Sequence, residues 1–82
     1  MPRRAAEPDP VAQRFGAAVR EAREQRKMTL EDLAGETRKR GGSLDPRYIG
    51  ELELGWHSPT ITTAQRLADA LDLTLAQLVY DV

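Results

Sequence analysis

Residues 29–55 constrain the fold most tightly, because they contain two short helix signals separated by a basic, glycine-containing interruption. The second signal begins at Asp45, a good N-cap residue, and Pro46, which is favoured at the first helical position. It ends at Gly55, which readily adopts the left-handed conformation that follows many helices. Between these ends only two side chains are clearly apolar, Ile49 and Leu52. So short and polar a helix is unstable alone. Neighbouring helices must therefore hold it, and its outer face is left free to bind a ligand.

Capping residues and apolar spacing predict four more helices around this one, and no strand-like alternation appears. The residues expected to cap the five helices are Asp9, Thr29, Asp45, Thr60 and Thr74. The first helix should end near Arg26 and the second at Arg38 or Lys39. Outside the 46–54 helix, the inward-facing residues should be Val11, Phe15, Ala18, Val19, Ala22, Leu30, Leu33, Ala34, Thr37, Ile61, Ala64, Leu67, Ala68, Leu71, Leu75, Leu78 and Val79. The pattern predicts an all-α, five-helix domain.

Length and composition indicate one small domain, residues 10–82, preceded by a flexible arm, residues 1–9, that is rich in proline, alanine and charge. The absence of cysteine among the 82 residues excludes disulfides and thiolate metal sites, and it fits a reducing cytoplasm. No apolar run is long enough to span a membrane. The single histidine leaves no metal-ligand set and no nucleophile–base pair, so we expect neither an enzyme nor a cofactor.

The formal net charge of −1 argues against indiscriminate coating of nucleic acid, but the charge is unevenly distributed. Residues 1–27 carry seven Lys or Arg and four Asp or Glu, a net +3, whereas residues 28–55 and 56–82 each carry −2. Any surface that faces phosphates must therefore use the N-terminal part and the basic run Arg38, Lys39 and Arg40. The alternative interpretation of this basic run is a solvated loop that makes no contact with phosphates.

From residue 15 to residue 79 a series of residues stands in a characteristic order and spacing. Its members are Arg20, Arg23, Met28, Thr29, Leu33, Ala34, Tyr48, Ile49, Leu52, Glu53, Gly55, Pro59, Thr60, Leu67, Ala68, Asp69, Ala70, Leu71, Leu75 and Leu78. This series resembles the Cro/cI-type (lambda-repressor-like, xenobiotic-response-element) helix-turn-helix DNA-binding domains. The resemblance implies a compact lambda-repressor-like fold that binds double-stranded DNA as a homodimer. It also implies a transcriptional repressor or autoregulator on bacterial or phage DNA in the cytoplasm.

The resemblance places base contacts on the 46–54 helix. They would come from Pro46, Arg47, Tyr48 and Glu51. Arg47 could grip guanine through two hydrogen bonds, whereas Pro46 could offer only apolar contact. Glu51 could accept from the amino group of cytosine or be a helix-surface charge, and Tyr48 should be partly buried with its hydroxyl outward.

Further DNA contacts are expected around this helix, and each has an alternative. Thr29 and the run 38–40 would approach phosphates, and Arg3 and Arg4 on the arm would enter the minor groove. Trp56 could donate to a phosphate or pack against a helix or a partner. The chain departs from the family at Leu30, Trp56 and His57, where the family often has polar or basic residues.

The resemblance also implies an ion pair, and the apolar C-terminal end of the chain suggests a dimer surface. Arg23 and Glu53 should form an ion pair that ties the 46–54 helix to the first one. Leu73, Tyr80 and Val82 are the candidate dimer surface. A rival interpretation is a protein-interaction module, an antitoxin or adaptor, which the acidic total, Pro46 and Trp56 favour.

Overall fold

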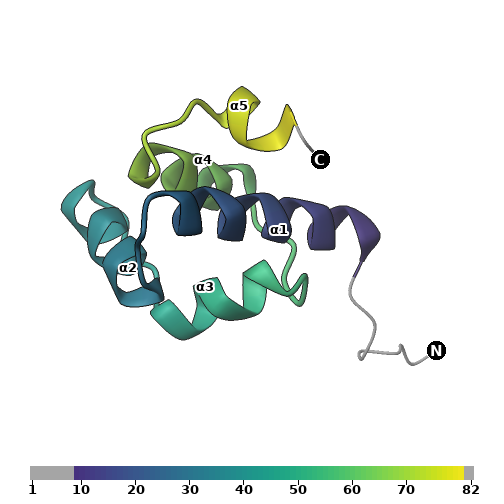
Figure 1. The fold of residues 1–82 in the computed structure, drawn as a ribbon, viewed down its shortest axis with the longest axis horizontal. Coiled ribbons are helices and arrows are strands. Elements are labelled where there is room, and N and C mark those ends of the chain that lie inside the picture. The colour runs from purple at the N-terminus through teal and green to yellow at the C-terminus, as the bar shows by residue number, and fades with distance from the viewer. Residues whose placement is uncertain (1–8, 81–82) are drawn as a thin grey trace.

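Five helices make up the part of the chain that the computed structural model describes, residues 9–80 (Figure 1). They are α1 (Pro10–Gln25), α2 (Leu30–Lys39), α3 (Pro46–Glu53), α4 (Ile61–Ala70) and α5 (Leu75–Tyr80). No strand occurs within that range. In Figure 1, α1 crosses the middle of the molecule with α3 on one side and α4 and α5 on the other. The predicted all-α, five-helix fold is confirmed. The arm residues Arg3 and Arg4 lie outside the described range.

The helices begin where the local sequence signals indicate, because the caps are satisfied within four residues. Thr29 and Asp32 form a reciprocal capping box, with both hydrogen bonds at 2.9 Å. Thr74 and Gln77 do the same at the start of α5. Single caps at the other starts come from Asp9, Asp45 and Thr60. Each cap satisfies backbone N–H groups that the helix leaves without a partner.

The core forms where the inner faces of all five helices meet. The core residues without any solvent exposure are Val19, Leu33, Ile49, Leu52, Leu67, Ala68 and Leu71. Leu78 from α5 closes the cluster from the C-terminal end. The helix α3 thus gains its stability from two buried residues that pack against its neighbours, as the sequence requires of so short an element.

Three residues that were expected to face inward are exposed: Val11, Ile61 and Val79. Val11 and Ile61 stand in the first turns of α1 and α4, and the exposed fraction of Ile61 reaches 79%. At these ends the neighbouring helices no longer cover the apolar stripe, so periodicity overestimates burial there. Ala12 takes the inward position at the start of α1.

Leu73, a candidate dimer contact, is half-buried and packs against the core, so part of its side chain stays exposed. Its role in a dimer stays a prediction. The side chain of Tyr80, the last residue of α5, and all of Val82 lie outside the described residues.

Gly16 lets α1 approach α3 more closely than any other residue could. A Cβ there would overlap the carbonyl oxygen of Leu52 and lie 2.8 Å from the carbonyl carbon and oxygen of Glu53. We expect Gly16→Ala to lower the free energy of unfolding by about 1–3 kcal/mol, although alanine is the better helix former. Denaturant unfolding followed by circular dichroism measures this change.

Gly35 in α2 provides the matched control, because a Cβ at this position would meet no atom within 4 Å. There the helix propensity of alanine acts alone, so Gly35→Ala should raise the free energy of unfolding by about 0.5–1 kcal/mol. Equal stabilisation by both substitutions would contradict the close α1–α3 contact.

Candidate nucleic-acid interface

The helix α3 turns its charged residues outward because Ile49, Leu52 and Glu53 occupy its inner face. Arg47 stands in the first turn, and 87% of its side chain is exposed. Glu51 lies one turn later on the same side, with Arg47 Nε 3.4 Å from its Oε2 atom. A cationic and an anionic side chain therefore project together from the outward face of α3.

His57 contacts Glu51, although it is neither on α3 nor among the residues expected at the site. Its Nε2 atom lies 2.8 Å from Oε1 of Glu51. Its ring stacks on the ring of Tyr48, with centroids 4.8 Å apart and planes 27° apart. The four side chains Arg47, Tyr48, Glu51 and His57 form one connected surface, which we call the α3 cluster.

The turn after α3 brings His57 back over the helix. Gly55 has a φ of +87° and donates its N–H to Leu52, while the N–H of Trp56 bonds to the carbonyl of Glu51 at 3.1 Å. This closure reverses the chain, so a residue six positions after Glu51 can reach its carboxylate. The Gly55 signal was visible in the sequence, but the direction in which it sends His57 was not.

Hydrogen bonds set the electrostatics of the α3 cluster. The bond with His57, and then the charge of Arg47, lower the pKa of Glu51, so its carboxylate is ionised at neutral pH. Burial raises the pKa of Tyr48, which is half-buried as expected from the sequence. The carboxylate of Glu51 is thus contacted by His57 at Oε1 and by Arg47 at Oε2.

Arg23 and Glu53 lie together, as the resemblance implied. Arg23 donates from Nε and Nη2 to the two carboxylate oxygens of Glu53 at 2.8 and 3.0 Å, and from Nη1 to the carbonyl of Met28 at 2.8 Å. Only 5% of the Glu53 side chain is exposed. The hydrogen bond to Glu53 raises the pKa of Arg23. One guanidinium thereby joins α1, the start of the helix-turn-helix and the last turn of α3.

The other expected contact residues stand at the two ends of α2 and at the two ends of α3. Arg38, Lys39 and Arg40 are exposed at the end of α2, where Glu36 lies 3.2 Å from Lys39 and 3.8 Å from Arg40. The following turn packs on α4, because a Cβ at Gly42 would collide with the Arg66 side chain. Thr29 and Trp56 are exposed, and Pro46 is half-buried.

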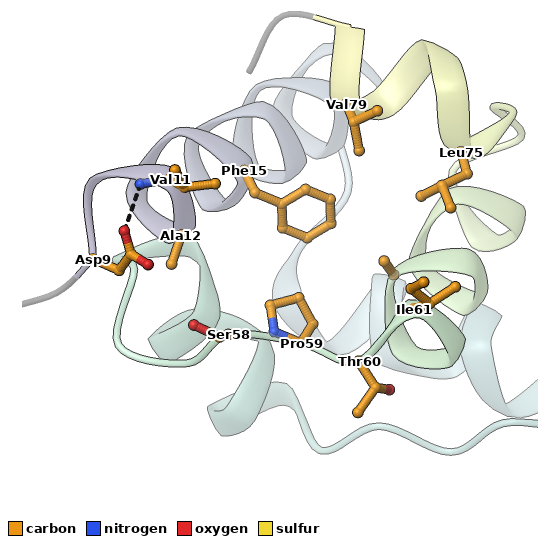
Figure 2. Close-up of a pocket in the computed structure, with 11 residues that line it drawn as sticks. Asp9, Val11, Ala12, Phe15, Ser58, Pro59, Thr60, Ile61, Leu75 and Val79 are labelled. Carbon is orange, nitrogen blue, oxygen red and sulfur yellow. Dashed lines mark hydrogen bonds between the residues drawn. The ribbon is translucent and has the colours of Figure 1, made fainter.

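A groove of about 450 Å³ opens between the start of α1, the start of α4 and α5 (Figure 2). Its lining is mostly apolar and includes Val11, Phe15, Pro59, Ile61, Leu75 and Val79. Val11, Ile61 and Val79, which are exposed although they were expected to face inward, all line this groove.

Among the described residues, no group of three or more His, Asp or Glu side chains could hold a metal ion. None of the described helices is long and apolar enough to cross a membrane.

Comparison with known proteins gives one match. A family model described as helix-turn-helix matches residues 19–78, which contain the C-terminal part of α1, all of α2, α3 and α4, and most of α5. No curated protein and no solved structure matches the chain significantly.

Proposed function

The chain belongs to the Cro/cI-type helix-turn-helix family of DNA-binding transcription regulators, and from this premise we propose that it recognises a specific sequence in double-stranded DNA. In this proposal α3 enters the major groove, and two copies bind paired half-sites about one helical turn apart. The dimer acts as a repressor or autoregulator, not as an enzyme, on bacterial or phage DNA in the cytoplasm.

The observation that carries the proposal is the exposure of Arg47 at the N-terminal turn of α3. A guanidinium can donate two parallel hydrogen bonds to O6 and N7 of guanine, a pairing that few other side chains make. Glu51 and His57 order the surface beside it. The cations for phosphate contact would come from the run 38–40, whose three side chains are exposed at the end of α2.

The apolar groove supports the dimer, and it adds a second candidate contact surface to the one that includes Leu73. Val11, Ile61 and Val79 surround it and are exposed in the single chain. A second copy would remove this apolar area from water, which favours association. The same groove also supports the rival proposal, an antitoxin or adaptor that binds a partner protein.

Selection of duplexes from a randomised pool, followed by sequencing, tests the proposed function. Enrichment of a two-fold symmetric site would support a dimeric, sequence-specific regulator. Enriched sites without half-site symmetry would contradict the dimer alone. If no sequence is enriched, the protein-interaction module becomes the better proposal.

Arg47→Ala is expected to weaken binding to the selected site by about 1–3 kcal/mol and to relax the preference at one base pair per half-site. Binding to random duplexes should change much less, because the lost contact is to a base. Titrations with both duplexes at one salt concentration measure the two effects. Equal losses on both would reassign Arg47 to a phosphate.

A further inference from the structure

The hydrogen bond between His57 and Glu51 suggests a role that the family match does not assign. We propose that His57 is a positioning residue for base recognition, which fixes the Glu51 carboxylate so that it accepts a hydrogen bond from a cytosine amino group. This inference rests on the proposed function, because it concerns the same DNA-facing surface.

The direction of the hydrogen bond follows from the chemistry of the two groups. An ionised carboxylate can only accept, so Nε2 of His57 must carry the proton and donate it to Oε1 of Glu51. The 2.8 Å separation is typical of a hydrogen bond strengthened by charge. The lowered pKa of Glu51, for which this bond is the largest cause, agrees with that assignment.

His57 can position Glu51 because its own ring is held. It lies against Tyr48, whose half-buried ring belongs to α3, and the backbone before it is tied to α3 by the Trp56 N–H. The imidazole is therefore fixed on two sides and donates toward the carboxylate from a defined direction. An unsupported glutamate would instead sample several rotamers and turn away from the phosphates.

Both contacts leave Glu51 able to bind a base. His57 uses Oε1 and Arg47 approaches Oε2, while each carboxylate oxygen can accept two hydrogen bonds. In the major groove, cytosine presents an amino donor and no acceptor. Guanine and thymine present acceptors that a carboxylate repels, and the amino group of adenine stands beside its N7 acceptor. Because Arg47 lies one turn earlier, the α3 cluster favours half-sites in which Arg47 meets a guanine and Glu51 meets a cytosine.

Two substitutions of His57 separate the hydrogen bond from the aromatic stack. His57→Phe keeps a ring against Tyr48 but has no N–H to donate, whereas His57→Gln keeps an N–H donor. Duplex selection with the parent, both variants and Glu51→Ala compares their base preferences. Glu51→Ala identifies the base pair at which Glu51 acts.

At that base pair, His57→Phe is expected to reduce the discrimination for cytosine by about tenfold, and the preference for guanine should persist. His57→Gln should retain most of the parent's discrimination. In the free protein, His57→Phe should raise the pKa of Glu51 toward its ordinary value, as followed by carboxylate chemical shifts in NMR.

The inference is overturned if His57→Phe keeps the parent's full base preference, or if His57→Gln loses as much discrimination as His57→Phe. An unchanged pKa of Glu51 in His57→Phe would also overturn it, without any DNA in the experiment. A parent that selects no sequence would overturn the proposed function together with the inference. If the parent protein selects clear base preferences and the His57 substitutions do not change them, the inference alone is overturned.

Discussion

Arg23→Ala is expected to lower the free energy of unfolding by about 3–5 kcal/mol, a large part of the stability of a small domain. The substitution leaves the carboxylate of Glu53 buried without its cation, and it removes the donor to the carbonyl of Met28. An unpaired charge in a low-dielectric site costs more than the pair itself contributes. Urea unfolding followed by circular dichroism measures the change.

Arg20→Ala is the matched control, because Arg20 lies on the same helix and also pairs with a glutamate. Its Nε atom is 3.0 Å from Glu24, but both side chains are more than half exposed. Water and salt screen such a pair, so its loss should cost no more than about 1 kcal/mol. Similar unfolding curves for the two variants would show that the Arg23–Glu53 pair does not hold α3 on α1.

The features that could be predicted from the sequence depend on residues close together in the chain. A capping hydrogen bond joins residues only a few positions apart, so Asp9, Thr29 and Thr74 could be recognised as N-caps from residue type and spacing. The left-handed turn at Gly55 is local in the same way. The Arg23–Glu53 pair joins positions thirty residues apart, and only the resemblance to a family suggested it.

The features that could not be predicted depend on how far one helix extends past another. Periodicity placed Val11 and Ile61 on inner faces, but it carries no information on where the covering helix ends. His57 was missed for a related reason, since its contact with Glu51 depends on the path of the turn between them. Arg47, by contrast, was expected at the surface from the resemblance to a family, and the bond from its N–H to the Asp45 cap places it in the first turn of α3.

Leu52→Ala is expected to lower the free energy of unfolding by about 2–5 kcal/mol. Leu52 has no solvent exposure and is one of two buried apolar side chains in the eight residues of α3. The substitution removes apolar contacts and leaves a cavity where α3 meets α1, so the neighbouring helices hold α3 less firmly. Because a free helix of two turns is unstable, the outward surface that carries Arg47 and Glu51 should lose order with it.

Leu54→Ala is the matched control, because it makes the same leucine-to-alanine change at an exposed position. Leu54 stands two positions later, caps the end of α3, and is 56% exposed. Leu54→Ala should therefore change the free energy of unfolding by no more than about 0.5 kcal/mol. Urea unfolding of both variants measures the difference, and amide exchange across residues 46–53 reports on the order of α3. If both substitutions destabilise equally, the packing of α3 against the core is not what keeps this helix folded.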